Sequence, residues 1–235
     1  MNEQSDIRVR VVSAAGDEPY RTIGAALADV APRTRIEVRP GAYVEPLIVE
    51  TPVEIVGAGP VADIVVHVTD ASCLVSRAAD VSVRGLTLRN SGSQHYEGRP
   101  AIAVEAGMLR LVDCHVDSDM ADGAVATGAG VLLVAERCAL GSATGSAVMS
   151  ERRARTDLAD CTIERAFTGV TIRQGAEVRM THCAVRDCEN AGLSFFEYGS
   201  GIIEDCEVER ATAMGIGILQ GSDPPFGAAS CATAT

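Results

Sequence analysis

A cysteine recurs at nearly constant spacing along the second half of the chain. It stands within the similar segments LVDCHV, AERCAL, LADCTI, MTHCAV and IEDCEV, at Cys114, Cys138, Cys161, Cys183 and Cys206. The intervals between successive cysteines are 24, 23, 22 and 23 residues. Repetition at such a period indicates that one structural unit is stacked several times, with each unit contacting only its neighbours.

Each repeat consists of short stretches of alternating apolar and polar residues separated by turns. The segment TGVTIRQGAEVRMTHCAV alternates, turns at a glycine and alternates again. This pattern is typical of two or three very short strands and leaves no room for a helix. Such a repeat closes one flattened coil, and successive coils pair in parallel about 4.8 Å apart. We predict an all-β fold, a single-stranded right-handed parallel β-helix solenoid.

The alternation also predicts which side chains enter the coil, because successive side chains of a strand point to opposite faces. In one repeat the inward set is Val170, Ile172, Val178, Met180, Cys183 and Val185. The outward set of the same repeat is Thr171, Arg173, Arg179 and His182. Hydrophobic residues make up 47% of the chain and aromatic residues only 3%, so the predicted core is aliphatic.

The repeated cysteines are predicted to be core residues. Each stands where an apolar side chain points inward, and Leu86 occupies the same place in the earlier segment VRGLTLRN. A metal-binding or redox role for stacked thiols is the alternative, but reduced and buried thiols fit this pattern better. Cys188 and Cys231 fall outside the repeat, and we expect them to be exposed.

The two ends of the solenoid differ. Thr22 precedes an apolar set at helical spacing and Pro32 stops it, which predicts a capping helix over about 22–31 that covers the first coil. We expect about eight coils within a domain of residues 1–221. Residues 222–235 lack a packing pattern. They are disordered, or the open end meets a second copy, or a further domain follows.

Charge and composition limit the partners. The chain carries 20 basic and 32 acidic residues, all the basic ones Arg, giving a formal charge of −12. Such a surface repels nucleic acid, anionic lipid and polyuronate chains. The first residues lack the layout of a signal peptide, and no apolar run is long enough to span a bilayer. We expect a cytoplasmic protein whose partner is a protein or a glycan.

The beginning of the chain carries a family resemblance. The segment PYRTIGAALADVAPRTRIEVRPGAYVEPLIVETPVEIVGAG contains a helix pattern, a strand, a PG-x-Y-x-E turn and a VG-x-G turn. In this order it resembles the opening of pectin-lyase-like β-helix proteins. The later G-V-x-I…V-x-L-x-x-C-x-I coils resemble the repeats of carbohydrate-binding and sugar-hydrolysis domains. The resemblance covers roughly residues 8–221 and implies the right-handed parallel β-helix.

The catalytic motifs of that superfamily are missing from the sequence. Pectin methylesterases carry Gln- and Asp-bearing motifs such as QDT and DFIFG, and neither string occurs here. The Asp pairs and the G-H-G motif of polygalacturonases are absent as well. The resemblance therefore implies a fold and assigns no catalytic residue.

An insertion provides the first candidate site. The segment NSGSQHYEGRP at 90–100 stretches the interval from Leu86 to Cys114 to 28 residues, and insertions of a solenoid leave the stack as loops. It contains an acid, a base, a ring and a cation. The candidate ligand-binding residues are His95, Tyr96, Glu97 and Arg99, together with Glu105 beneath them. We expect the loop to border the deepest groove, over Ala103, Glu105 and Thr127.

Two further clusters contain ionisable groups. His182 precedes a repeated cysteine and is expected to lie between Asp160 and Asp205 of the adjacent coils, as a candidate base or as part of a solvated charge ladder. The turn at 113–123 concentrates carboxylates, of which Asp117, Asp119 and Asp122 are the candidate ligands for Ca²⁺. Because the spacing is not that of a defined calcium loop, no cofactor is the first expectation.

Exposed rings and arginines complete the candidates. In the segment SFFEY, Phe195 is predicted to point inward, so Phe196 or Tyr198 faces solvent and provides a contact surface. The ERRAR turn at 151–155, with Arg173 in the next coil, offers guanidinium groups to an anion or forms ordinary surface ion pairs.

Two functions are consistent with the sequence. The first is a non-catalytic recognition or scaffold module that binds a protein or a glycan on its elongated face. The alternative is a carbohydrate-active enzyme, a polysaccharide lyase, hydrolase or epimerase. For that alternative, His95 and Glu97 with the Asp117–Asp122 turn, and also His182, are the candidate catalytic residues.

Overall fold

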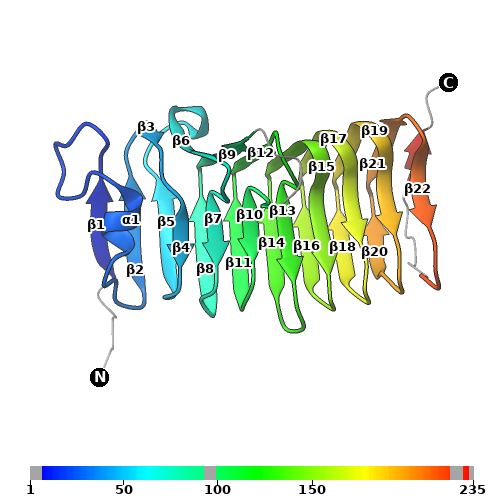
Figure 1. The fold of residues 1–235 in the computed structure, drawn as a ribbon, viewed down its shortest axis with the longest axis horizontal. Coiled ribbons are helices and arrows are strands. Elements are labelled where there is room, and N and C mark those ends of the chain that lie inside the picture. Colours follow the sequence, from blue (N-terminus) through cyan, green and yellow to red (C-terminus); the bar gives the residue numbers. More distant parts are fainter. Residues whose placement is uncertain (1–6, 93–98, 223–229, 233–235) are drawn as a thin grey trace.

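The chain folds as a parallel β-helix of nine coils, one more than expected. The computed structural model describes residues 7–92, 99–222 and 230–232, and Figure 1 shows their strands stacked along one long axis. Each coil has three faces, called here faces A, B and C in chain order. All strand pairs given below are parallel, so the predicted all-β solenoid is confirmed.

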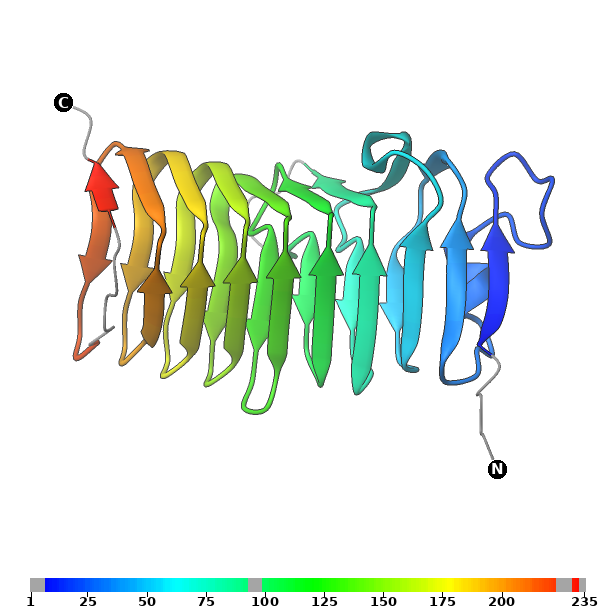
Figure 2. The ribbon, with the colours of Figure 1, turned by 180° about the vertical axis from the view of Figure 1, so that it is seen from behind.

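Face A is a nine-stranded sheet that is turned toward the viewer in Figure 2. Each of its strands has five residues, and alternate residues point into the narrow interior, as Val178 and Met180 do in β18. The strands of face A are β1 (Arg8–Val12), β2 (Thr34–Val38), β5 (Val53–Gly57), β8 (Asp80–Arg84), β11 (Met108–Val112), β14 (Leu132–Glu136), β16 (Arg155–Ala159), β18 (Glu177–Thr181) and β20 (Ser200–Glu204).

Face B follows face A in each coil. Its strands are β3 (Gly41–Tyr43), β6 (Ile64–Thr69), β9 (Thr87–Ser91), β12 (His115–Ser118), the first parts of β15 (Ala139–Glu151), β17 (Thr162–Ile172) and β19 (Ala184–Phe195), then β21 (Glu207–Ala211) and β23 (Ser230–Ala232). A short 3-10 helix, η1 (Val61–Asp63), precedes β6.

Face C completes the coil before the chain returns to face A. It consists of β4 (Leu47–Val49), β7 (Leu74–Ser76), β10 (Ile102–Val104), β13 (Ala124–Thr127), the second parts of β15, β17 and β19, and β22 (Met214–Ile218). Register shifts inside β15 and β17 mark the corner where one long strand turns from face B to face C.

The corner between faces A and B is a single residue in the left-handed conformation. In five successive coils this residue is Asp113, Arg137, Asp160, His182 or Asp205, with φ between 51° and 53°. Aspartate and histidine tolerate this conformation better than most residues, which suits four of the five positions. The turn sends the next residue, the repeated cysteine, into the interior, while the corner side chain remains outside.

The inward and outward assignments are confirmed with one exception. Val170, Ile172, Val178, Met180, Cys183 and Val185 are all buried, and Phe195 is fully buried. Thr171 was expected to be exposed, but only 8% of it is accessible. Its side chain still points outward, in register with Met149 and Ser194, and its hydroxyl lies 2.8 Å from the hydroxyl of Ser146.

The repeated cysteines form an internal ladder. All five are buried, and Leu86 takes the equivalent place in an earlier coil. Their sulfurs lie beside strand carbonyls, as where the Cys161 thiol donates to Ala135 O at 3.4 Å. A hydrogen bond to the neighbouring thiol of the ladder raises the pKa of Cys138 and that of Cys183. Cys138 and Cys183 are therefore held as neutral thiols in the core.

The expectation of an exposed Cys188 is wrong. This residue is 1% exposed, and burial raises the pKa of its thiol to about 11. The reason is a second left-handed residue, Asp187, with φ 54°, between faces B and C. It shifts the phase of the alternation by one residue, so Cys188 points inward. Cys231 lies in a part of the chain whose side chains are not described.

The helix at the start caps the first coil, as predicted, but it is shorter than expected. It extends over Ile23–Leu27 (α1), with Thr22 as N-cap accepting a hydrogen bond from Ala25 N. The helix ends early because Ala28 is extended. The Arg10 guanidinium then binds the released carbonyls, Ala26 O at 2.7 Å and Ala28 O at 2.8 Å.

The last part of the chain was expected to lack packed structure. Ser230–Ala232 instead forms strand β23, which pairs with β21 and continues face B by one strand. Contact of this end of the solenoid with a second copy, or with a further domain, stays a prediction. The described part of the chain contains no helix with the length and apolar character that crossing a membrane requires.

The buried ladder predicts slow thiol chemistry. In native protein, Cys161 and Cys183 should react with a thiol reagent far more slowly than the same residues after denaturation, because only opening of the coils exposes them. Mass spectrometry of the labelled peptides measures both rates. Rapid labelling of either residue in the native state would contradict the burial of the ladder.

Candidate functional site

Among the described residues, the central positions of the strands of face C have uncharged outward side chains. One residue at the centre of each strand points away from the core, and these residues are in register from coil to coil. In order along the solenoid they are Ile48, Val75, Ala103, Val125, Met149, Thr171, Ser194 and Gly217. The first five are apolar, so five coils share a continuous apolar floor.

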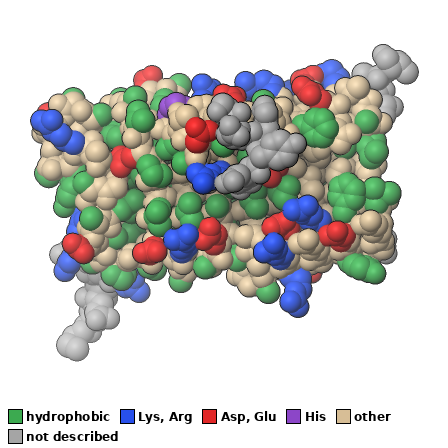
Figure 3. Space-filling model, in the orientation of Figure 1, with side chains coloured by type: hydrophobic (Ala, Val, Ile, Leu, Met, Phe, Trp, Pro, Cys, Tyr) green, Lys and Arg blue, Asp and Glu red, His purple; other side chains and the backbone are tan. Residues whose placement is uncertain are grey.

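One border of this floor is a ladder of mostly charged residues. The residue that follows the last inward position of each strand stacks on its equivalents, giving Glu50, Arg77, Glu105, Thr127, Glu151, Arg173, Phe196 and Leu219. We call this set the rim ladder. Figure 3 shows hydrophobic side chains over the middle of the face and a row of alternating acidic and basic side chains below it.

Arg77 links the two carboxylates next to it in the rim ladder. Its Nε lies 2.7 Å from Glu105 Oε2, and its Nη1 lies 3.7 Å from Glu50 Oε1. The hydrogen bond to Glu105 and the charges of both carboxylates raise the pKa of the Arg77 guanidinium. The outer parts of these groups are about half exposed, so each can still bind a hydroxyl of a ligand.

Glu151 forms a second linked group farther along the rim ladder. Arg173 Nη2 lies 2.6 Å from Glu151 Oε2, and Thr127 Oγ1 donates to Glu151 Oε1 at 3.2 Å. The Glu151 side chain is only 12% exposed, while Arg173 is 41% exposed. The carboxylate therefore holds the guanidinium through its Nε and Nη2, and the partly exposed guanidinium keeps further N–H groups for a ligand.

Asp122 lies on the opposite border of the floor, in the turn before β13. It is half-buried, and its Oδ1 accepts a hydrogen bond from Ser146 N at 2.6 Å. Burial raises the pKa of the Asp122 carboxyl, although the Ser146 N–H and the charge of Arg173 act in the opposite direction. This is a carboxyl with perturbed acidity next to the outer surface of face C.

A cavity of about 610 Å³ lies at the end of the floor next to α1. Its walls are the helix on one side and β4 with its following turn on the other. Leu27 and Ile48 supply apolar surface, and Asp29, Glu50 and Arg77 supply charged groups. The deepest groove was expected beside Ala103, Glu105 and Thr127 under the 90–100 insertion, and because residues 93–98 lie outside the described residues this stays a prediction.

The candidate residues of the 90–100 insertion are only partly described. His95, Tyr96 and Glu97 lie outside the described residues. Arg99 is described, and its Nη1 donates to Asp70 O at 2.6 Å, while its own carbonyl accepts from the buried Asn90. Glu105 belongs to the rim ladder. A ligand role for these residues stays a prediction.

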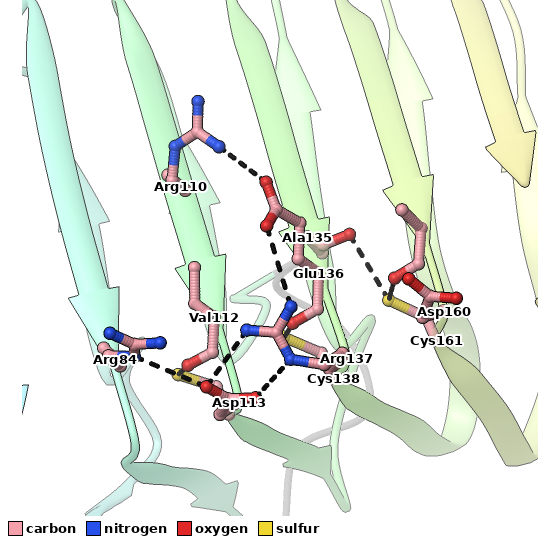
Figure 4. Close-up of polar contacts among 12 residues, drawn as sticks. Arg84, Arg110, Val112, Asp113, Ala135, Glu136, Arg137, Cys138, Asp160 and Cys161 are labelled. Carbon is pink, nitrogen blue, oxygen red and sulfur yellow. Dashed lines mark hydrogen bonds and ion pairs between the residues drawn. The ribbon is translucent and has the colours of Figure 1, made fainter.

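His182 lies far from face C, at the corner between faces A and B. Its Nδ1 is 3.9 Å from Asp160 Oδ1 and its Nε2 is 3.7 Å from Asp205 Oδ2, so the predicted position between two carboxylates is confirmed. Figure 4 shows the same corner in earlier coils, where Arg137 contacts Asp113 at 2.7 Å. This arrangement is an exposed charge ladder, and the structure gives it no cavity.

The calcium candidates are not brought together. Asp117 contacts Arg89 at 3.2 Å, Asp122 accepts from Ser146 N, and Asp119 is exposed. Within residues 7–92, 99–222 and 230–232, no three His, Cys, Asp or Glu side chains are grouped as a metal site. The turn that concentrates these carboxylates in sequence spreads them over different directions in space.

Phe196 and Tyr198 both lie on the outer side of the coil. Tyr198 is 74% exposed, and Phe196, a member of the rim ladder, is partly exposed. The rim ladder and the cavity next to α1 were not predicted from the sequence. Aligning the residue after the last inward position of every coil would have found the ladder, whereas the cavity has no sequence signal.

Several solved structures share this fold at low sequence identity. A deglycosylated pectin methylesterase from Aspergillus niger has a TM-score of 0.72 and 13% identity, with 96% of this chain and 85% of that one covered. A pectin methylesterase in complex with a hexasaccharide has a TM-score of 0.63 and 12% identity, with 96% and 90% covered.

A third similar structure has a different activity. The A-module of a mannuronan C-5 epimerase from Azotobacter vinelandii has a TM-score of 0.56 and 13% identity, with 82% of this chain and 67% of that one covered. No curated protein matches the chain. At these identities the likeness shows the pectin-lyase-like fold alone.

A sequence family supports the same conclusion independently of the structure. The model of the right handed beta helix region matches residues 100–228, more than half of the chain. This span contains the cysteine ladder, most of face C and the larger part of the rim ladder. The chain belongs to the right-handed β-helix family.

Proposed function

We propose that this chain is a carbohydrate-active β-helix protein that binds an extended glycan along face C. The observation that carries the proposal is the apolar floor from Ile48 to Met149, bordered by the charged rim ladder. Sugar rings present apolar C–H faces and polar edges. A flat apolar surface with hydrogen-bonding groups along its border complements both.

The dimensions of face C suit a linear polymer. Its eight strands are separated by seven spacings of about 4.8 Å, which gives a length of about 34 Å. The described strands of face A carry charged side chains where those of face C carry apolar ones. On face A, for example, Arg35 pairs with Glu54 at 2.7 Å and Arg110 with Glu136 at 2.6 Å. Such charges interrupt the apolar surface on which a sugar ring would rest.

The fold comparison favours a glycan over a protein partner. The similar structures described above are named as enzymes of pectin and mannuronan, and one of them is a complex with a hexasaccharide. The charge of −12 disfavours polyanionic chains, so we expect a glycan of low charge, such as methyl-esterified pectin.

A second candidate function is catalysis on the bound glycan by Asp122. The observation that favours it is a half-buried carboxyl whose pKa is raised by burial, a combination typical of general acids. Its position on the border of the floor brings it within reach of a chain lying on face C. The guanidinium of Arg173 on the other border can then stabilise negative charge that develops on the sugar.

Binding on face C predicts a difference between two matched variants. Val125 and Val134 lie in successive coils, both at the outward centre of a strand and both partly exposed, on face C and face A respectively. Val125→Arg should weaken binding to methyl-esterified pectin more than about tenfold, because it places a charge on the apolar floor. Val134→Arg should bind like the wild type.

Isothermal titration with oligosaccharides long enough to span face C measures both affinities, and thermal melts check that both variants are folded. Equal loss of affinity in the two variants, or an unchanged affinity of Val125→Arg, would show that the glycan does not lie on face C.

The raised pKa of Asp122 makes a separate prediction about stability. The pKa of the Asp122 carboxyl in the folded protein is above its ordinary value of 3.8. The protonated carboxyl therefore contributes its full stabilisation of the folded state below pH 3.8. This stabilisation is lost as the pH rises through the folded-state pKa. Asp122→Asn should therefore be more stable than the wild type at pH 7 and equally stable at pH 3.

Urea denaturation at the two pH values measures this difference. If the second candidate function holds, the same variant loses all release of reducing ends or methanol from pectin while its affinity for the glycan is retained. A variant that is less stable than the wild type at pH 7 would contradict the raised pKa.

A further inference from the structure

The first coil contains α1 where the later coils contain a strand of face C. The helix lies beside β4, the first strand of this face, and contacts β1, β2 and β4. Glu45, in the turn before β4, accepts from Ile23 N at 2.7 Å and from Gly24 N at 2.8 Å. A helix with its side chains is about 10 Å in diameter, about twice the spacing of about 4.8 Å between neighbouring strands. The helix α1 therefore stands above the outer surface of β4 and forms a wall at this end of the floor.

This wall is fixed in place at both of its ends. The carboxylate of Glu45 holds the first turn, and the guanidinium of Arg10 holds the last carbonyls of the helix, including Asp29 O at 3.2 Å. Ile23 and Ala26 are fully buried in the core of the solenoid. The helix therefore belongs to the rigid part of the structure and is a permanent border of face C.

The opposite end of face C is open in the described part of the chain. After β22 no described helix covers the sheet, and Ile218 and Leu219 are 44% and 50% exposed. Figure 1 shows α1 near the N-terminal end only, with plain strands continuing to β22. The floor is thus closed on one side and continuous with solvent on the other.

We propose that the cavity between α1 and β4 binds the terminal sugar unit of a glycan, so that the protein recognises chain ends rather than chain interiors. This inference rests on the proposed binding of a glycan along face C. A linear chain that lies on the floor and points toward β4 meets α1 and stops there. The cavity of about 610 Å³ at this point is large enough for one sugar unit with its solvent.

The lining of the cavity matches the chemistry of a chain terminus. A terminal sugar has one more free hydroxyl than an internal unit, and hydroxyls bind to carboxylates and guanidinium groups. Asp29 and Glu50 supply acceptors, and Arg77 supplies donors from the start of the rim ladder. Ile48, at 52% exposure, gives the apolar surface on which the ring can rest.

Stoichiometry on polymers of different length tests the inference. The probes are a short and a long size fraction of methyl-esterified pectin, and light scattering measures how many wild-type molecules bind each chain at saturation. Recognition of a chain terminus predicts the same number on both fractions. A number that rises in proportion to chain length would show binding to chain interiors and would overturn the inference while leaving glycan binding on face C intact.

A pair of variants tests the position of the terminal unit. Ile48→Arg should lower the affinity for the short fraction more than about tenfold, because the added side chain fills the cavity. Val44→Arg is the matched control, since Val44 is 78% exposed on the neighbouring turn and does not line the cavity. It should bind like the wild type.

Different results would contradict glycan binding on face C and recognition of the chain end. An unchanged affinity of Ile48→Arg, in a variant that melts like the wild type, would overturn the assignment of the cavity. Absence of wild-type binding to either fraction would contradict the proposed glycan function and, with it, the inference about chain ends.

Discussion

Parallel hydrogen bonding between successive coils is the interaction on which the rest of this structure depends. Each strand is paired in register with its equivalents in the coils before and after it, so a position in one coil is repeated about 4.8 Å away in the next. Side chains therefore meet their own equivalents. The cysteines stack on cysteines inside, and on the surface Asp113 meets Arg137. Each face of the molecule is a set of such ladders. The residue types in its outward ladders decide whether that face is charged, polar or apolar.

This constraint explains why face C differs from the other two. Charged residues placed in register on face A pair with each other along the solenoid, as Arg35 does with Glu54, so the outer surface of this face is charged. On face C the central ladder is apolar and the charges are confined to its border. A surface of this kind costs free energy in water, and contact with a ligand that covers it recovers part of that cost. The catalytic candidate Asp122 and the rim residue Arg173 lie at the two edges of the same surface.

The candidate functional features lie where the regular stacking is interrupted. The helix α1 replaces a strand in the first coil, and a cavity forms where helix and strand do not fit together. The turn before β13 leaves Asp122 half-buried with a raised pKa, whereas carboxylates on the regular ladders, such as Asp113, have a pKa lowered by the neighbouring guanidinium groups. A repeated fold supplies a scaffold that varies little, and individual coils acquire chemistry through local departures from the repeat.

The amino-acid sequence by itself determined the β-helix, the cysteine ladder, the capping position of Thr22 and the place of His182 between two carboxylates. All of these follow from the period of the repeat and from alternation within one strand, which are properties of residues close in the chain. Only the tertiary structure decided that Cys188 is buried, that Asp117, Asp119 and Asp122 point to different partners, and that Arg77 lies between Glu50 and Glu105. The first depends on a left-handed residue that shifts the alternation, and the others depend on which residues of coils more than 20 positions apart come into register. Alternation within a strand does not contain that information, because the irregular early coils and the turns between faces differ in length from one repeat to the next.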